Sequence, residues 1–357
     1  MKKTVSLIGL AVILLSFVFS LAACRAPFEQ KEYKTRSKTV SYSHFNTVSM
    51  LSTYGDVTDG EFERYCTIAD EMLGRYHKLF DIYYEYAGIN NIRTVNQNAG
   101  KSPVAVDREL IEFLLYCKEV YTLTGGKTNI MFGSVLSIWH DKREEADDNG
   151  GYLDGALLPT SEELAEANRH TAIDSLVIDE AAGTVYISDP DASIDVGAIA
   201  KGYAAEKLAE RLKREGADSM AINAGGNIVT VGLKPNGDAW VTGITNPDRT
   251  AESSFICKVE IGETALVTSG DYERYFVSGD RIYHHVIDPE TLMPAAYFSA
   301  VSIFTSDGAR ADALSTALFC MPYEEGLALV KSLDGVEVLW ITKDGAIRAT
   351  DGVKITE

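Results

Sequence analysis

The chain has few of the residues that build zinc sites and disulfide frameworks. Among 357 residues there are five cysteines and six histidines, and no two cysteines have C-x-x-C spacing. No His/Cys cluster has the spacing of a zinc site either. After Cys24, which is discussed below, we assign Cys66, Cys117, Cys257 and Cys320 to core positions, and a disulfide between two of them stays open.

Positive charge is also scarce. Lys and Arg number 33 against 52 Asp and Glu, which gives a formal net charge of −19. A nucleic-acid-binding protein neutralises phosphates with clustered Lys and Arg, and no such basic stripe occurs. The sequence therefore argues against a nucleic-acid partner. It also lacks internal repeats and low-complexity blocks, and its 46% apolar content fits an ordinary globular protein.

An apolar run from Val5 to Ala23 follows two lysines and ends in Leu-Ala-Ala-Cys at Cys24. The run is too short, and too closely followed by polar residues, for a secure membrane span. It predicts a secretory signal peptide, residues 1–23, with a lipobox; a plain signal anchor is the alternative. Cleavage before Cys24 would leave this residue to carry lipid, and several acyl chains anchor a protein stably. We expect a lipid-anchored protein on the extracytoplasmic face of the cell membrane.

Residues 24–40 are predicted to form a tether, and residues 41–357 a single domain. Between Arg25 and Lys38 there are five basic residues against two Glu, which suits a segment close to anionic lipid. The acidic, Gly-rich segment Asp141–Gly155 is predicted to be an exposed loop or small insertion.

Short strand-like runs joined by turns, with helices between groups of them, predict an α+β fold with mostly antiparallel sheets and packed helices. Apolar positions from Leu110 to Val120 fall on one helical face, and Gly125-Gly126 ends that helix. Turns at Asp179–Gly183 and Gly279-Asp280 are typical of hairpins. The expected strands are Leu176–Ile178, Val185–Ile187, Met220–Ile222, Ile228–Val231, Phe255–Val259, Ile282–Ile287, Ala300–Phe304 and Val336–Ile341.

A possible cation site lies near the C-terminus, at Asp312, Ser315 and Thr316. On a helix the positions i, i+3 and i+4 share a face, so these three side chains can present oxygens to one point. Mg²⁺ prefers oxygen ligands and usually takes one or two carboxylates from a protein. Taken alone the pattern is weak, because Asp and Ser or Thr at this spacing also occur on solvated helix faces.

A second motif reads Asp-Val-Gly-Ala-Ile-Ala-Lys-Gly-Tyr from Asp195 to Tyr203. We expect Asp195 to cap a helix that continues through Leu208 and Leu212. Lys201 would then lie in the first helical turn, where a cation is unfavourable unless an anion lies nearby. A bound phosphate would meet that need; the alternative is an exposed lysine on a capped helix.

Three further motifs follow in order. Asn-Ala-Gly-Gly-Asn at 223–227 predicts a tight hairpin, and Thr-Ser-Gly-Asp-Tyr occupies 268–272. His-His-Val-Ile-Asp-Pro begins at His284. Adjacent residues of a strand point to opposite faces, so one of His284 and His285 is expected to face a pocket.

In this order the motifs resemble those of the ApbE family of FAD:protein FMN transferases, from Phe45 to the C-terminus. The resemblance implies an ApbE-like (T-fold-like) architecture, Mg²⁺ as cofactor and FAD as substrate. It implies transfer of the FMN moiety of FAD to a Ser or Thr hydroxyl of an acceptor flavoprotein, with release of AMP. Acceptors in the family are membrane-associated flavoprotein subunits on the same side of the membrane, which agrees with a lipid tether.

The resemblance also implies roles for individual residues. His285 would be the base that takes the proton of the acceptor hydroxyl, since an imidazole titrates near working pH. The metal would be held by Asp312, Ser315, Thr316 and the main-chain carbonyl of Ala198. The residues expected to contact FAD are Phe45, Tyr83, Lys127, Thr128, Asn129, Asp195, Lys201 and Val286.

The chain departs from the family pattern at a few positions. Asn129 replaces the common Asp, Met131 a frequent Thr and Ser134 a Pro, and Leu292 replaces the usual Gly. These changes affect the flavin pocket and a turn rather than the metal ligands.

Two other functions fit the same motifs. One is a metal-dependent FAD pyrophosphatase, in which water replaces the acceptor hydroxyl. The other is a non-catalytic FAD-binding lipoprotein, against which Asp312, Thr316 and His285 argue, because capture needs neither metal nor base. Transfer and hydrolysis use the same pyrophosphate clamp, so the sequence does not separate them.

Overall fold

The computed structural model describes residues 34–356. The predicted signal peptide 1–23, Cys24 and the tether up to residue 33 lie outside these residues. From Thr35 onward the chain forms one compact unit. Strand β1 covers Thr35–Ser41, so the last residues of the predicted tether 24–40 belong to a sheet instead. The folded domain accordingly begins before residue 41.

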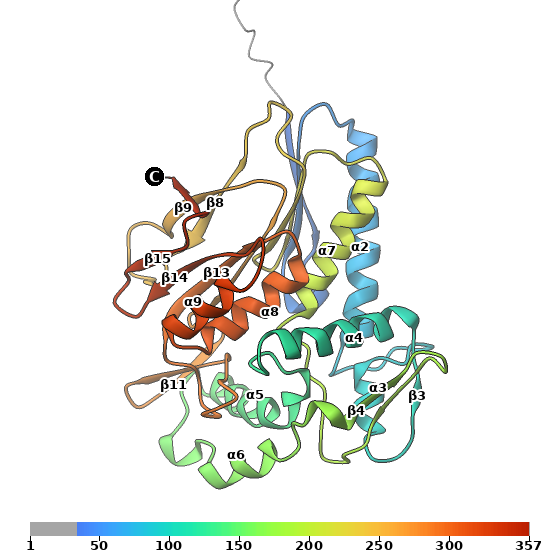
Figure 1. Ribbon diagram of the computed structural model, residues 1–357, viewed down its shortest axis with the longest axis vertical. Coiled ribbons are helices and arrows are strands. Elements are labelled where there is room, and N and C mark those ends of the chain that lie inside the picture. The colour runs from blue at the N-terminus through green and yellow to red at the C-terminus, as the bar shows by residue number, and fades with distance from the viewer. Residues whose placement is uncertain (1–33, 357) are drawn as a thin grey trace, which may run out of the picture. The chain divides into compact units, whose positions relative to one another are not determined.

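An eight-stranded sheet forms the centre of the fold, and its pairings are antiparallel. Helices α2 (Asp59–Phe80), α7 (Ala200–Arg214) and α8 (Gly308–Phe319) pack against it, with α2 and α7 side by side (Figure 1). In spatial order the strands are β1, β2 (Ser49–Tyr54), β6 (Met220–Ala224), β7 (Asn227–Val231), β10 (Ala265–Gly270), β13 (Phe298–Thr305), β14 (Glu337–Thr342) and β15 (Ile347–Ala349).

Three smaller sheets and further helices complete the domain. The sheets have the orders β16-β9-β8, β11-β12 and β3-β5-β4. Their strands are β3 (Val104–Ala105), β4 (Leu176–Asp179), β5 (Thr184–Ile187), β8 (Trp240–Thr245), β9 (Phe255–Ile261), β11 (Tyr275–Ser278), β12 (Arg281–His284) and β16 (Lys354–Thr356). The remaining α-helices are α3 (Ile92–Gln97), α4 (Arg108–Leu123), α5 (Gly133–Asp148), α6 (Ser161–Asn168) and α9 (Tyr323–Lys331).

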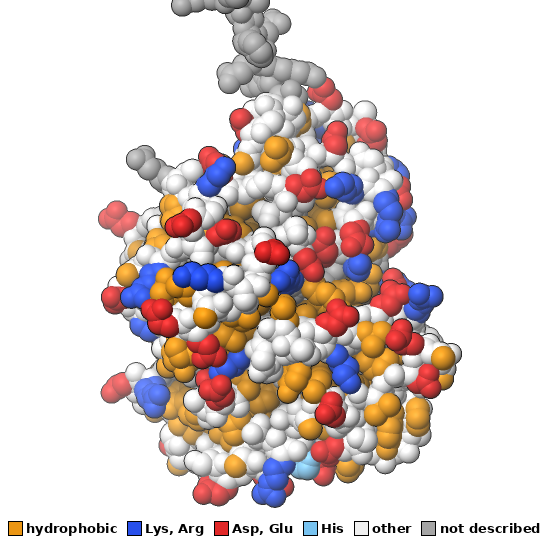
Figure 2. Space-filling view, viewed as in Figure 1, with side chains coloured by type: hydrophobic (Ala, Val, Ile, Leu, Met, Phe, Trp, Pro, Cys, Tyr) orange, Lys and Arg blue, Asp and Glu red, His pale blue; other side chains and the backbone are white. Residues whose placement is uncertain are grey.

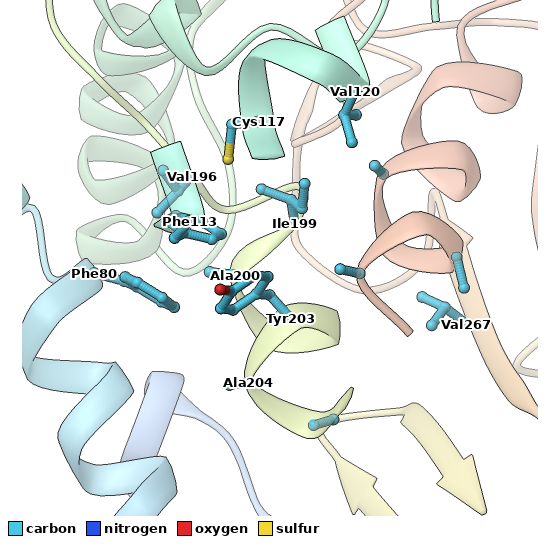
Figure 3. Close-up of a cluster of buried hydrophobic side chains, with 14 of the residues drawn as sticks. Phe80, Phe113, Cys117, Val120, Val196, Ile199, Ala200, Tyr203, Ala204 and Val267 are labelled. Carbon is cyan, nitrogen blue, oxygen red and sulfur yellow. The ribbon is translucent and has the colours of Figure 1, made fainter. Parts of the chain in front are cut away.

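The main core lies between the helices and the large sheet. Aromatic rings from three helices meet there: Phe80 of α2 stacks on Phe113 of α4 at 4.0 Å, and Phe113 contacts Tyr203 of α7 at 4.9 Å (Figure 3). Val196 and Ile199 bury their side chains in the same cluster. The segment that carries the Asp195 motif is therefore fixed by core packing at the point where it reaches the surface of a cavity.

Helix termini are formed by local signals that the sequence contains. Thr58 and Glu61 form a capping box at the start of α2. Asp307 caps α8, accepting hydrogen bonds from the N–H groups of Ala309 and Arg310 at 2.9 and 3.0 Å. These caps fix where the two helices begin and hence where their side chains lie.

The predicted α+β class with mostly antiparallel sheets is confirmed, as is the helix over Leu110–Val120, which lies within α4. The hairpins at Asp179–Gly183 and Gly279-Asp280 join β4 to β5 and β11 to β12. Within the described residues the four cysteines Cys66, Cys117, Cys257 and Cys320 are free thiols.

Two predictions about elements were wrong. The strand Ile282–Ile287 ends at His284, where the His284 ring bonds to the carbonyl of Ala295 and the chain turns. The segment Asp141–Gly155 is helical up to Asp148, because it continues α5. Val135, Trp139 and Ala146 give α5 one buried face, and its charged residues lie on the other side.

The face drawn in Figure 2 carries Asp and Glu interspersed with Lys and Arg, with apolar side chains between them. Among residues 34–356, none of the helices combines the length and the apolar character that a membrane crossing requires.

Leu292 replaces the glycine expected from the ApbE pattern and has a φ of 60°, in the left-handed region. Its carbonyl accepts a hydrogen bond from Trp139 Nε1 at 2.9 Å. Its side chain packs against a buried cluster that includes Trp139, Phe276 and Tyr283. Packing and the turn hold a conformation that costs a residue with a Cβ about 1–2 kcal/mol.

Two substitutions at this position separate strain from packing. Leu292→Ala and Leu292→Gly both lose the side-chain contacts, but glycine alone also relieves the strain. After the extra backbone entropy of glycine, we expect Leu292→Gly to have the higher free energy of unfolding by roughly 0.5–1 kcal/mol. Urea denaturation measures the difference; an alanine variant more stable than the glycine variant by roughly 0.5–1 kcal/mol would show that this turn stores no strain.

Candidate active site

A cavity of about 940 Å³ opens beside the large sheet, bounded by the end of α2, by α5, by the start of α7, by the middle of α8 and by β8. Its walls bring together nearly all residues that the sequence singled out. The predicted site residues that line it are Phe45, Tyr83, Lys127, Thr128, Asn129, Asp195, Ala198, Lys201, His285, Val286, Asp312 and Thr316.

The close packing of α7 against α8 positions the acidic group of the site. Gly202 N–H donates to Asp312 Oδ2 at 2.8 Å, and Lys201 Nζ lies 3.9 Å from the same oxygen. A Cβ added to Gly202 would lie 2.2 Å from Gly308 O, so only glycine permits this approach. Burial raises the pKa of the Asp312 carboxyl, and the charge of Lys201 opposes that shift.

The predicted cation ligands divide into two groups. Asp312, Thr316 and Ala198 line the cavity, whereas Ser315 does not. The Ser315 hydroxyl is fully buried and bonds to Asp312 O at 2.8 Å and to Ser269 Oγ at 2.7 Å. At 3.6 residues per turn, Ser315 lies about 60° to one side of Asp312 and Thr316 about 40° to the other, so the two side chains diverge. The expectation that Ser315 faces the cation is therefore wrong.

The residues that remain fit a hard cation. A buried carboxyl, a hydroxyl one helical turn further on and a main-chain carbonyl are oxygen donors of the kind that Mg²⁺ prefers. Burial raises the pKa of the Asp312 carboxyl, and a positive charge closer than Lys201, at 3.9 Å, would stabilise the carboxylate form.

Asp195 was expected to cap α7, and this expectation was wrong. Its Oδ1 accepts a hydrogen bond from Gly197 N–H at 2.8 Å, which closes a tight turn ahead of the helix. Helix α7 begins at Ala200, with Ile199 at the N-cap and no side-chain cap. Asp312 of α8 serves instead, since it accepts the N–H of Gly202 in the first turn.

His285 has the features of a base. Its main-chain N–H donates to Arg274 O at 3.0 Å, while its Nδ1 is buried and has no hydrogen-bond partner. Burial, followed by the positive charge of Arg274, lowers the pKa of His285 to about 3. The imidazole is therefore neutral at neutral pH and, in these surroundings, a weak base. An anionic ligand would offset the nearby cations and raise that pKa.

The neighbouring histidine has a different role. His284 Nε2 bonds to Ala295 O at 2.8 Å, and its ring packs edge-on against Phe319. Its ring nitrogen thus holds the loop in place rather than remaining free.

Lys127, Thr128 and Asn129 hold one wall of the cavity together. Lys127 is buried between Asp288 and Glu290, at 3.1 and 3.0 Å, so its charge is neutralised within the chain. Thr128 Oγ1 donates to Ala313 O at 2.8 Å. Asn129 Oδ1 accepts from Met131 N–H at 2.9 Å, and its Nδ2 donates to Thr171 O. Lys201, with its nearest carboxylate 3.9 Å away, is the better placed cation for an anionic ligand.

Two aromatic residues stand at the cavity wall. Phe45 lies in the short helix η1 (His44–Asn46) and packs edge-on against His77 at 5.8 Å. Tyr83 is 43% exposed, and its ring lies 5.3 Å from that of His140. These two rings offer apolar surface to a planar ligand.

Sequence motifs missed several lining residues. Arg143 and Arg274 lie on α5 and in the loop before β11, and burial together with the charge of Arg274 lowers the pKa of Arg143. Arg143 falls in the segment that was predicted to be a loop, where helical periodicity was the available signal. The other missed residues lie outside the motifs and include Asn46, His77, Trp139, His140, Thr242, Gly243, Ile244 and Thr245.

A sequence profile described as the ApbE family matches residues 45–340 of this chain. The chain belongs to the ApbE family. The FAD:protein FMN transferase of Treponema pallidum (strain Nichols) is 34% identical over 277 residues, covering 73% of each chain. The protein of the same name from Vibrio cholerae is 27% identical over 338 residues, covering 94% of this chain and 93% of the relative.

Solved structures agree. The ApbE protein of Thermotoga maritima aligns with a TM-score of 0.74 at 25% identity, over 89% of this chain and 97% of that one. The flavin transferase ApbE of Vibrio cholerae aligns with a TM-score of 0.70 at 23% identity and shows the same fold. The predictions of an ApbE-like fold and of a transferase enzyme of this family are confirmed.

Proposed function

We propose that this protein is a Mg²⁺-dependent FAD:protein FMN transferase that moves the FMN moiety of FAD to a Ser or Thr hydroxyl and releases AMP. The observation that carries the proposal is the meeting of Lys201, Asp312, Thr316 and His285 in one cavity. The cavity volume is near the upper end of ordinary ligand pockets, as a dinucleotide requires. The names of the relatives support the same activity.

The residues of the chain have distinct tasks in this reaction. Lys201 would bind the pyrophosphate of FAD, while Phe45 and Tyr83 would pack against its rings. The acceptor hydroxyl would give its proton to the imidazole of His285 as its oxygen bonds to the phosphorus of the FMN half. The bond from that phosphorus to the AMP oxygen breaks, and AMP leaves.

Asp312, Thr316 and the carbonyl of Ala198 would hold Mg²⁺. The ion would neutralise charge on the pyrophosphate, which otherwise opposes attack by an oxygen nucleophile. Lys201 Nζ, 3.9 Å from Asp312 Oδ2, would add positive charge near the pyrophosphate, and the hydrogen bond from Gly202 N–H to Asp312 fixes the carboxylate in place.

The test combines residues 25–357 with FAD, Mg²⁺ and a membrane-associated flavoprotein subunit, followed by mass spectrometry of that subunit. We expect a gain of one FMN unit and an equal amount of AMP. His285→Ala should reduce transfer about a hundredfold or more while FAD still binds; His170→Ala, outside the cavity, is the control.

The products distinguish the alternatives. Free FMN and AMP with no gain in mass, for every subunit tried, would indicate a pyrophosphatase. Bound but intact FAD would indicate a carrier.

The structure separates Thr316 from Ser315 as metal ligands. Thr316→Ala should raise the Mg²⁺ concentration for half-maximal turnover by about tenfold, since one oxygen ligand is lost. Ser315→Ala should leave that concentration unchanged and lower the free energy of unfolding by about 1 kcal/mol, because it removes buried hydrogen bonds. Titration of both variants with Mg²⁺ measures the contrast, and a reversed order would contradict this ligand set.

We also propose that the protein is anchored by lipid on Cys24 at the extracytoplasmic face of the membrane, where its acceptor subunit is exposed. Metabolic labelling with palmitate should mark the wild type and fail to mark Cys24→Ser, which should leave the membrane fraction. Cys257→Ser, a change within the folded domain, should keep the label. Palmitate on Cys24→Ser would contradict the anchor.

A further inference from the structure

The short helix η1 has an unusual backbone. Phe45 and Asn46 follow one another with φ values of 55° and 52°, both in the left-handed region. A bulky residue such as Phe rarely adopts this conformation, which persists only where the surroundings enforce it. Both residues line the cavity, so a contact from a neighbouring element must hold this turn in place.

His77, near the end of α2, makes that contact. The main-chain N–H of Phe45 donates to His77 Nδ1 at 3.3 Å, and the Phe45 ring packs edge-on against the imidazole. His77 is therefore an acceptor at Nδ1, and its ring proton lies on Nε2.

The other ring nitrogen of His77 is linked to the segment that carries Tyr83, through Tyr86 and Asp81. His77 Nε2 lies 3.3 Å from Tyr86 Oη, and Tyr86 Oη donates to Asp81 Oδ2 at 2.6 Å. Asp81 Oδ1 then accepts the main-chain N–H groups of Tyr83 and Tyr84 at 2.6 and 3.1 Å.

These bonds are mutually compatible, and Asp81 accepts from both sides. The Nε2–H of His77 donates to Tyr86 Oη, and the Tyr86 hydroxyl donates to Asp81. The main-chain N–H of Phe45 donates to His77 Nδ1. A continuous hydrogen-bond relay thus joins the backbone of Phe45 to the backbone of Tyr83. His77 bonds to Phe45 on one side and to Tyr86 on the other.

We infer that His77 is a positioning residue for FAD, which in its Nε2–H tautomer holds Phe45 and Tyr83 at the spacing that the bound dinucleotide requires. The inference rests on the proposed function, in which these two aromatic residues contact FAD. In this role His77 acts by fixing the backbone of Phe45 and of Tyr83.

The surroundings of His77 favour the neutral ring. Burial lowers the pKa of His77, and the charges of His44 and Lys78 act in the same direction, while Asp81 opposes them. The His44 ring lies 5.9 Å from His77, and its Nε2 is paired with Asp70 at 2.9 Å. A proton on Nδ1 would remove the acceptor for Phe45 N–H.

Substitutions at His77 test the relay through FAD affinity, measured by equilibrium titration with Mg²⁺ and without an acceptor protein. His77→Phe keeps a ring of similar size and removes both hydrogen bonds, so we expect FAD to bind about tenfold more weakly. His77→Asn places its Oδ1 near the position of Nδ1, which restores the acceptor for Phe45 but not the donor to Tyr86. We expect its affinity to return to within about threefold of wild type.

His170→Phe is the matched control. The His170 and His77 side chains are 24% and 23% exposed, and His170 pairs with Asp189 rather than with the relay. Its FAD affinity should equal that of the wild type. Tyr86→Phe keeps the ring and breaks the link to Asp81, so it should weaken FAD binding even if His77→Phe does not fold.

The outcomes distinguish a failure of the proposed function from a failure of the role of His77. Wild-type protein that binds no FAD would overturn the proposed function itself. FAD binding by the wild type with unchanged affinity in His77→Phe, or in Tyr86→Phe where His77→Phe does not fold, would overturn only the role of His77. Equal weakening in His77→Phe and His77→Asn, with wild-type melting temperatures, would also overturn it, because the restored acceptor would then have no effect.

Discussion

The contact between α7 and α8 is the constraint on which the site depends. Gly202 and Gly308 lack side chains at the point where the helices meet, and this lets the N–H of Gly202 reach Asp312 Oδ2 at 2.8 Å. One hydrogen bond thereby completes the first turn of α7 and fixes the carboxylate. A side chain at Gly202 would separate the helices and move Asp312, Thr316 and Lys201 relative to one another.

The same burial that stabilises the fold prepares the cavity for a charged ligand. Low solvent access raises the pKa of Asp312 and lowers that of His285. Burial disfavours the charged form of both groups, and each charged form gains when the opposite charge arrives: a cation beside Asp312, an anion among Lys201, Arg143 and Arg274. The metal-bound dinucleotide phosphate of the proposed reaction would supply both.

Several interpretations of the sequence succeeded because they depended on local spacing. The helix across Asp312 and Thr316, the Gly-Gly hairpin at 225–226 and the hairpin before β12 follow from patterns within a few residues. Interpretations that depended on a direction in space failed. Ser315 shares a helix with Asp312 but turns toward Ser269, and Asp195 closes its own turn while Asp312, more than a hundred residues away, caps α7.

The sequence by itself determined the family, the α+β class and the identities of most cavity residues, since ordered motifs and hydrophobic periodicity are properties of short segments. The tertiary structure alone decided which oxygens of α8 face the cavity, which lysine stays available and which histidine nitrogen is uncommitted. It alone linked His77 to Phe45 directly and to Tyr83 through Tyr86 and Asp81. These outcomes depend on how separate segments pack, because a hydrogen bond or a pKa shift is set by neighbours in space and not by neighbours along the chain.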